Sequence, residues 1–386
     1  MDEELFWLES PDLNNFAHLD RMSFSSRYSA STCLRKYYFE RAGYRRNTFF
    51  KTLRGDVIHN SIESLNKLLA DEECANEEAI SIIFQKRQTN FRKVIESEIK
   101  EVFEKSKQNP RFARLIKKFE GKFIAEKEEM IEMLKSGLSN SFDEHNEFVE
   151  KKPREGDPIK KRKTEIEIGT YIEKELFSEK LNDMGKVDKL VVKDNEVHII
   201  DFKTGEKKSF HKDQLYFYQI LWTDDKRNIA NKSVSKLEID YLNGTSKNYD
   251  PLSHDQIHHK RLEYIKEKEK LLKLNKIEDF KPTINENCQY CFCRQNCEEY
   301  WNGHQTETDI EVTVENTDGQ PYKVKSTKND SMKFRLFFSN QVDPYIQMLQ
   351  EGRKYRVLGA KIDEGSNKIT IFESSEIFTE EHYKDI

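Results

Sequence analysis

Four cysteines occur in two places far apart in the chain. They are Cys33 near the start and Cys288, Cys291 and Cys297 toward the end, the last three spaced Cys-x2-Cys-x5-Cys. Four thiolates hold either a zinc ion or an iron–sulfur cluster, and the spacing alone does not choose between them. We expect this site to join two segments about 250 residues apart, which closes a long loop.

Between these cysteines lies a group of residues suited to a hard metal ion. Asp201 and Lys203 end a mostly apolar run, and strand alternation places both side chains on one face. Asp188 lies in the preceding strand, and the turn at Asp194-Asn195 is about six residues from each aspartate. In an antiparallel hairpin the two carboxylates lie side by side, where they repel each other unless Mg²⁺ or Mn²⁺ joins them. Lys203 would then orient or deprotonate water, whereas the alternative is an ordinary surface strand.

Three further residues indicate the same centre less specifically. His59 follows Gly55, where we expect a helix to start, and Gln214 and Tyr218 are four residues apart on one helix face. Taken singly, a histidine of this kind is more often structural, and the glutamine and tyrosine fit any helix surface.

The four motifs together resemble one nuclease family. They occur in the order Gly-x3-His (55–59), Gly-x2-Asp (185–188), Asp-x-Lys (201–203) and Gln-x3-Tyr (214–218). This order resembles the RecB-type branch of the PD-(D/E)XK nucleases, which includes CRISPR-associated RecB-like nucleases and the nuclease domains of helicase–nucleases. The resemblance covers about residues 25–300. Its iron–sulfur members add one early cysteine and a late Cys-x2-Cys-x5-Cys, as here.

The resemblance implies a role for each matching residue. His59, Asp188 and Asp201 would bind Mg²⁺ or Mn²⁺, Lys203 would serve the attacking water, and Gln214 and Tyr218 would support the site or touch DNA. Cys33, Cys288, Cys291 and Cys297 would hold a [4Fe–4S] cluster. Asp201 stands where much of the wider superfamily has Glu, and Cys293 is extra to the pattern.

The segments that must position these residues read as a mixed α/β core. We expect helices over 29–69, strands at 165–168, 184–192 and 197–201, a helix at 209–222, a strand at 237–242 and a helix at 254–274. The resemblance implies a restriction-endonuclease-like sheet. We assign residues 1–24 to an extension and 25–304 to the nuclease domain, with a helical insertion at about 76–150. The basic, proline-containing stretch 151–163 reads as a linker or a DNA-contacting loop.

The last eighty residues form a second pattern. Strands are expected at about 309–315, 321–326, 332–338, 354–362 and 368–373, with a short helix starting at Asp343-Pro344. Three strands, a helix and two strands is the order of an OB-fold barrel, which we assign to 305–386. Its lysines and arginines alternate with aromatic residues, as single-strand binding requires. The alternatives are that the aromatics fill the barrel core, or that the barrel docks onto a partner protein.

Composition limits the remaining classes. The chain has 386 residues, a net charge of -5 and 35% charged residues, and it contains no apolar stretch of about 18 residues. We therefore expect no membrane span and, since the start lacks a signal-peptide pattern, a cytoplasmic protein with reduced thiols. No phosphate-binding loop of the Gly-x4-Gly-Lys-Ser/Thr type occurs, so any unwinding must come from a partner helicase.

The sequence therefore predicts a metal-dependent DNA nuclease. We expect an exonuclease that acts on single-stranded DNA ends in repair, recombination or defence, together with a helicase or another repair or defence protein. The alternative is a non-catalytic nucleic-acid-binding or scaffolding subunit of a helicase–nuclease complex.

Overall fold

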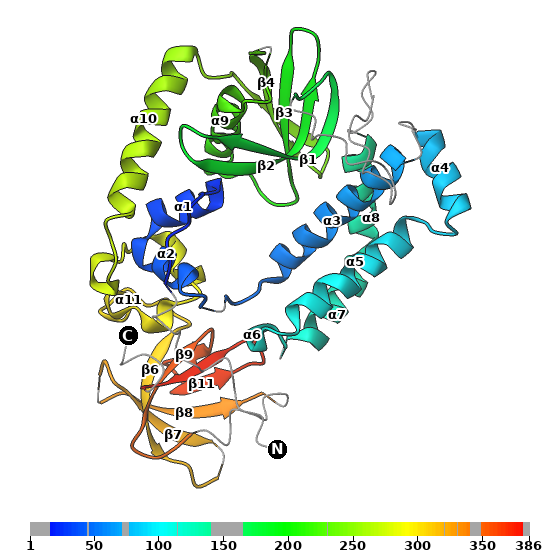
Figure 1. The fold of residues 1–386 in the computed structure, drawn as a ribbon. Helices are drawn as coiled ribbons and strands as arrows, with labels where there is room; N and C mark the ends of the chain where they lie inside the picture. The colour runs from blue at the N-terminus through cyan, green and yellow to red at the C-terminus, as the bar shows by residue number, and fades with distance from the viewer. Residues whose placement is uncertain are drawn as a thin grey trace.

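A computed structural model describes most of the chain (Figure 1). The described residues are 16–44, 46–71, 77–113, 115–139, 165–229, 231–319, 321–329, 331–339 and 349–380. The expected linker at 151–163 and the expected helix from Asp343 lie outside them. Among the described helices, none is both long and apolar enough to cross a membrane.

A five-stranded mixed sheet forms the centre of the larger region. Its strands are β1 (Gly169–Ser178), β2 (Asp183–Val192), β3 (Val197–Lys203), β4 (Val234–Tyr241) and β5 (Thr245–Tyr249), which neighbour one another in that order. Only the β3–β4 pair is parallel, because helix α9 (Phe210–Asp224) connects these two strands as a crossover. One face of the sheet packs on α9, and residues such as Phe202 and Val191 on the other face join a helical core.

The expected strand at 165–168 is wrong. Strand β1 begins only at Gly169, because Ile166 is buried while Ile168 is half exposed, so this pair does not share one buried face. Strand β5 was not anticipated, since its residues are almost all polar and exposed at the sheet edge.

Three helices precede the helical insertion. They are α1 (Phe24–Thr32), α2 (Leu34–Arg41) and α3 (Phe50–Asp71). The expectation that Gly55 starts a helix is wrong, because Gly55 lies in the second turn of α3. A Cβ atom there would lie 3.1 Å from Thr204 Oγ1, so glycine lets α3 approach the end of β3 closely.

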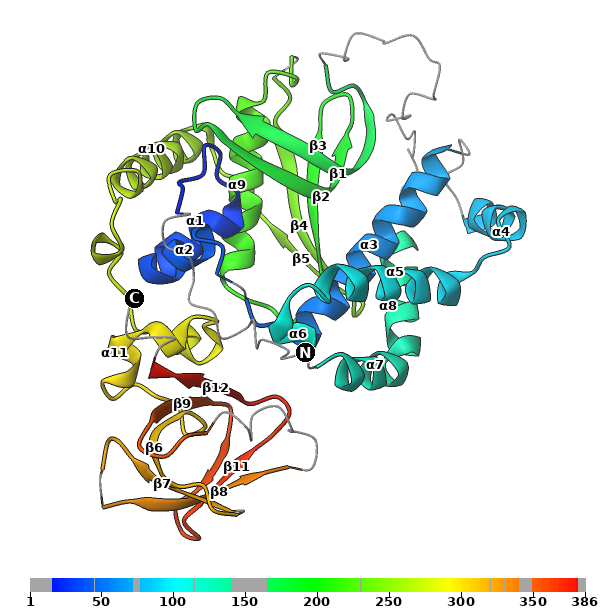
Figure 2. The same ribbon diagram turned by 60° about the horizontal axis from the view of Figure 1, so that its bottom comes forward.

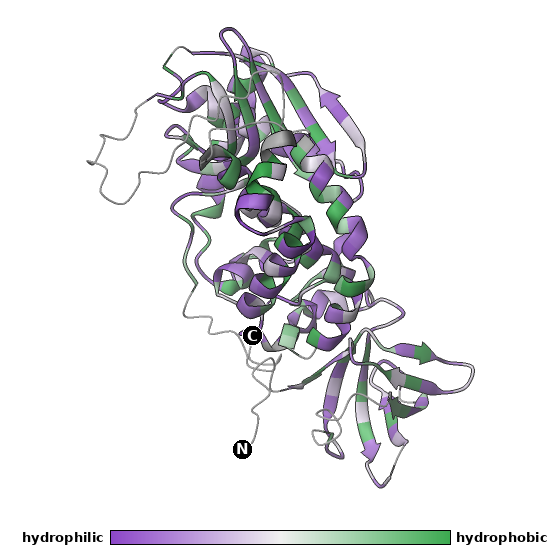
Figure 3. Ribbon diagram, turned by 90° about the vertical axis from the view of Figure 1, so that its right-hand side faces the viewer, coloured by the Kyte–Doolittle hydropathy of each residue, from purple (hydrophilic) through white to green (hydrophobic). Residues whose placement is uncertain are grey.

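The helical insertion is a compact group beside α3 (Figure 2). It contains α4 (Glu77–Lys86), α5 (Phe91–Ser106), α6 (Pro110–Ala113), α7 (Ile116–Ala125) and α8 (Lys127–Ser139). Its apolar faces share one buried core with α3 and with the outer face of the sheet. Figure 3, seen from the right-hand side of Figure 1, shows both hydrophilic and hydrophobic residues along the helices on that side.

A long helix leads from the central sheet to the late cysteines. Helix α10 (His254–Leu271) begins with a capping box at Ser253 and Gln256. The short 3₁₀ helices η3 (Ile277–Asp279), η4 (Glu286–Tyr290) and η5 (Arg294–Asn296) and helix α11 (Glu298–Trp301) follow. In Figure 1 this segment lies between α2 and the C-terminal strands.

The C-terminal region is a seven-stranded sheet. Its strands are β6 (Ile310–Asn316), β7 (Tyr322–Ser326), β8 (Lys333–Phe338), β9 (Lys354–Leu358), β10 (Lys361–Asp363), β11 (Lys368–Ile371) and β12 (Glu376–Thr379). The strand order is β10-β11-β8-β7-β6-β9-β12. The single strand expected at 354–362 is two strands, because Gly359 has a φ of 70° and bends the chain between them.

The aromatic residues of this sheet mostly fill its core. Tyr322, Phe334 and Tyr355 are buried, and Phe337 is half buried with the Lys368 ammonium 4.5 Å from its ring centroid. Arg356 is also buried, where it pairs with Glu311 and Glu298. The expectation that these aromatics alternate with cations on a base-stacking surface is therefore wrong for the three buried rings.

Candidate active site

Three side chains from separate elements converge at one edge of the central sheet. They are His59 of α3, Glu173 of β1 and Asp188 of β2, and one ligand atom from each lies within 4.8 Å of the others. All three are half buried, so solvent reaches the centre while the surrounding sheet restricts it. An imidazole and two carboxylates at this separation are a suitable donor set for a divalent metal ion.

Asp201 and Lys203 lie beside this group. The predicted hairpin forms, and its register pairs Leu190 with Ile199 and Lys189 with Ile200, so the next position brings Asp188 opposite Asp201. The backbone N–H of Phe202 donates to Asp188 Oδ2 at 2.6 Å, which fixes the orientation of that carboxylate. Asp201 is buried, and the Lys203 ammonium lies against its Oδ2 as an ion pair.

The electrostatics of the group favour binding of a divalent cation. Burial raises the pKa of both Asp188 and Asp201 to about 6, even though the charge of Lys203 opposes the rise. Burial and the same lysine lower the pKa of His59, so its imidazole is neutral and able to ligate. Two neighbouring carboxylates that share one ammonium group fit a divalent ion, which would balance their remaining negative charge.

Lys203 carries a proton in this environment. Burial alone would disfavour the ammonium form, but the carboxylates of Asp201 and Asp188 outweigh burial and raise the pKa of Lys203. The side chain therefore acts as a hydrogen-bond donor and a positive charge, which favours orienting water over deprotonating it.

Gln214 and Tyr218 of α9 form a pair against the hairpin. The Gln214 side-chain amide donates to the Tyr218 hydroxyl at 2.8 Å, and burial followed by the two nearby aspartates raises the Tyr218 pKa well above its ordinary value. A Cβ at Gly185 would lie 2.9 Å from Tyr218 Cε1 and 2.8 Å from Leu221 Cδ1. The glycine of the Gly-x2-Asp motif therefore makes room for α9 beneath the carboxylates.

Glu173 was missed in the sequence. In β1, Ile172 pairs with Lys189 and Lys174 with Val187, so Glu173 stands opposite Asp188. Its φ of 55° is rare for a residue with a side chain, and Lys186 pairs with its carboxylate at 2.6 Å. The aromatic and β-branched residues Tyr171, Ile172 and Phe177 are a signal for the strand, but no spaced motif marks the glutamate.

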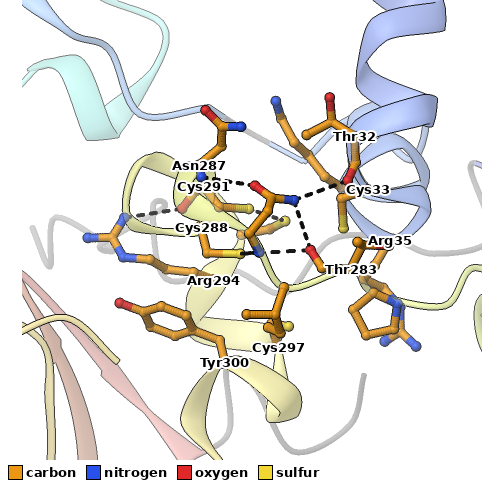
Figure 4. Close-up of a pocket in the computed structure, with 15 residues that line it drawn as sticks. Thr32, Cys33, Arg35, Thr283, Asn287, Cys288, Cys291, Arg294, Cys297 and Tyr300 are labelled. Atoms are coloured by element: carbon orange, nitrogen blue, oxygen red, sulfur yellow. Dashed lines mark hydrogen bonds between the residues drawn. The ribbon is translucent and has the colours of Figure 1, made fainter. Parts of the chain in front are cut away.

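The four expected cysteines surround one pocket (Figure 4). Cys33 lies between α1 and α2, whereas Cys288, Cys291 and Cys297 come from the segment after α10. Asn285 joins the two segments, because its side-chain amide donates to the Thr32 carbonyl at 3.2 Å and its backbone N–H donates to Cys288 Sγ at 3.3 Å. The early and late cysteines therefore line the same pocket.

Cys293 also lines this pocket. Its sulfur lies 3.4 Å from Cys291 Sγ, and this contact is the main cause that lowers the pKa of Cys291 to about 7, with Lys36 and Arg294 contributing. Burial, in contrast, raises the pKa of Cys297 to about 11. At least one thiol is thus poised to become a thiolate, the form that binds metals.

Comparison with known proteins agrees with this geometry. A search of curated proteins finds no match to the chain. The family model described as the PD-(D/E)XK nuclease superfamily matches residues 21–298, a span that contains both the metal-ligand candidates and all of the pocket cysteines. The chain belongs to the PD-(D/E)XK nuclease superfamily.

Proposed function

We propose that this protein is a Mg²⁺- or Mn²⁺-dependent deoxyribonuclease of the RecB type. The observation that carries the proposal is the convergence of His59, Glu173 and Asp188 beside the Asp201–Lys203 ion pair. Two neighbouring carboxylates beside one lysine suit a catalytic metal centre better than they suit a non-catalytic subunit.

His59, Glu173, Asp188 and Asp201 would hold the metal. When bound, a divalent ion stabilises the charge that develops on the phosphate and lowers the pKa of water. Carboxylates favour Mg²⁺ and Mn²⁺, and the imidazole is compatible with the softer of the two.

The chain's own groups would complete the chemistry. Lys203 donates hydrogen bonds to the attacking water or to a non-bridging phosphate oxygen, and its charge balances the pentavalent transition state. Tyr218, held by Gln214, packs beneath the aspartates and restricts their side chains. Each role stabilises the transition state more than the bound substrate, so its loss should lower kcat.

The cysteine pocket would hold a [4Fe–4S] cluster. The support is the resemblance to the iron–sulfur members of the family, which combine one early cysteine with a late Cys-x2-Cys-x5-Cys as this chain does. Cys33, Cys288, Cys291 and Cys297 would be its ligands, with Cys293 adjacent.

The C-terminal sheet would be an OB-like barrel. Strand β10 lies at one end of the strand order and β9 next to the other end, yet only residues 359–360 separate them. The meander β6–β8, the antiparallel β6–β9 pair and the parallel β8–β11 pair support this interpretation. Because most of its aromatic side chains are buried, the barrel would have a structural role and would not stack on DNA bases.

We further propose that the enzyme is an exonuclease on single-stranded DNA ends in repair, recombination or defence, working with a helicase. The test compares end-labelled linear and covalently circular DNA, each single- and double-stranded, with Mn²⁺. The proposal predicts degradation of linear single strands and none of circles, and no activity in Lys203→Met. Cleavage of circles would refute the exonuclease mode, and absence of any cleavage would refute the nuclease assignment.

A further inference from the structure

A groove separate from the metal centre lies where three parts of the chain meet. Its walls are the start of α3, helix α7, the late cysteine segment and the edge of the C-terminal sheet, and it encloses about 740 Å³. Lining residues from these parts include Phe49, Lys122, Tyr290 and Gly359. None of the residues assigned to the metal centre lines it.

Two exposed aromatic rings dominate the groove. Phe49 is 44% exposed and Tyr290 is 61% exposed, although most large aromatic side chains of the described structure are buried. Their ring centroids are 6.3 Å apart and the rings are nearly perpendicular. An exposed tyrosine beside an exposed phenylalanine offers faces on which planar groups can stack.

Two lysines give the groove positive charge. Lys118 and Lys122 are exposed, lie four residues apart on one face of α7 and line the groove. Neither makes an ion pair with a carboxylate within the described ranges, whereas Glu376, a groove carboxylate, is neutralised by Arg111 at 2.6 Å. Glu307 is the opposing charge, so the walls still carry a net excess of positive charge.

The groove is linked to the metal centre by α3. Phe49 precedes the first residue of this helix, and His59 lies nine residues after Phe50. At 1.5 Å per residue the metal ligand is about 14 Å along the helix axis from the groove. A DNA strand a few nucleotides long could therefore extend from the groove to the catalytic side chains.

We propose that this groove binds the single-stranded part of the DNA substrate. Phe49 and Tyr290 stack on bases, and Lys118 and Lys122 contact phosphates, which is the combination that single-strand binding uses. The inference rests on the proposed nuclease function and adds to it a binding track outside the metal centre. Lysines flanking exposed rings favour a polyanion with planar groups over an apolar peptide.

The experiment measures binding of fluorescein-labelled (dT)20 and of a 20-base-pair duplex by anisotropy, with the full chain and no added divalent metal. Tyr290→Ala should weaken (dT)20 binding about tenfold or more, and Tyr290→Phe should restore it, because stacking needs only the ring. Phe49→Ala, which leaves the cysteine segment unchanged, should show the same selective loss. Ile124→Ala, an exposed apolar residue on α7, is the matched control.

The salt dependence separates the two kinds of contact. Removing Lys118 and Lys122 together should make the slope of log K against log salt shallower by about 1.4, since each single-strand phosphate contact contributes about 0.7. Tyr290→Ala should leave this slope unchanged. The exposed pair Lys266 and Lys270 on α10 has the same spacing and is the charge control.

Unchanged (dT)20 binding in Tyr290→Ala, Phe49→Ala and the Lys118/Lys122 variant overturns the proposal and leaves the groove to a protein partner. An equal loss on duplex and single strand also overturns it. These binding measurements need no catalysis, so their outcome can be distinguished from a failure of the proposed nuclease function. If the wild type cleaves DNA and the groove variants bind (dT)20 normally, the groove proposal is refuted and the nuclease proposal stands.

Discussion

The charge of Asp201 should destabilise the metal-free protein at neutral pH. The side chain is 1% exposed, and burial raises its pKa from 3.8 to about 6. Because the folded chain binds this proton more tightly than the unfolded chain, its contribution to stability is full below about pH 4 and is lost as the pH rises through about 6. Above that pH, the ionised carboxylate lowers the free energy of unfolding.

Asp201→Asn should therefore stabilise the metal-free protein at pH 7. The difference between 3.8 and about 6 corresponds to about 3 kcal/mol, which is an upper limit. Lys203 loses its ion-pair partner in the variant, although Asp188 remains near it, so we expect a gain of about 1–2 kcal/mol. This gain corresponds to a melting temperature higher by a few degrees.

When metal is added, the wild type should have the higher melting temperature of the two proteins. A ligand at 100 times its Kd stabilises the folded state by about 2.7 kcal/mol. In our proposal Asp201 is a metal ligand, so the variant should gain less from the metal than the wild type. The assay is thermal unfolding at pH 7 with EDTA and with excess Mn²⁺. Asp194→Asn, in the exposed turn of the same hairpin, is the control and should respond like the wild type.

Two outcomes would refute this reasoning. An Asp201→Asn protein with a lower melting temperature than the wild type in EDTA would show that the ionised Asp201 carboxylate does not destabilise the fold. A variant that gains as much from Mn²⁺ as the wild type would remove Asp201 from the metal site.

Three other changes should separate chemistry from structure. Lys203→Met should lower kcat at least a hundredfold while the Mn²⁺-induced rise in melting temperature persists, because the lysine acts on water and phosphate rather than on the metal. Gly185→Ala should cost about 1–3 kcal/mol of stability, seen in denaturant unfolding, because the new Cβ lies under 3 Å from α9 side chains. An equally stable variant would contradict the packing at this point. Cys33→Ser should lose the broad visible absorption of an iron–sulfur cluster and melt lower; a colourless wild type carrying stoichiometric zinc would replace the cluster with a zinc site.

The hairpin that carries Asp188 and Asp201 could be predicted from the sequence. An apolar run, a tight Asp194-Asn195 turn and equal distances from that turn fix its register, because side chains alternate with a period of two. The sequence also predicted that Cys33 and the late cysteines share one site, and all four line one pocket.

Glu173 could not be found in the same way. It belongs to no spaced motif, and its strand begins at Gly169 after a short alternating stretch that drew the prediction to 165–168. Its approach to Asp188 depends on the pairing of β1 with β2 and on its own positive φ, neither of which local pattern reveals.

The C-terminal aromatics show a second limit of pattern reading. Alternating aromatic and basic residues are equally consistent with a stacking surface and with a filled core, because both place aromatics on one face of a strand. Tyr322, Phe334 and Tyr355 are buried, so these three aromatic side chains belong to the core and not to a stacking surface. The exposed residues Phe49 and Tyr290 lie some 240 residues apart in the chain, so only the fold brings the two rings together.

The most direct test of the account is a Mn²⁺ titration of DNA cleavage by the wild type and by Asp188→Asn. The measurement follows release of label from linear single-stranded DNA as Mn²⁺ rises from zero in a chelated buffer. The account predicts no cleavage without metal, saturable activity for the wild type and none for the variant at any Mn²⁺ concentration. Cleavage by the wild type in EDTA, or full activity of Asp188→Asn, would contradict it.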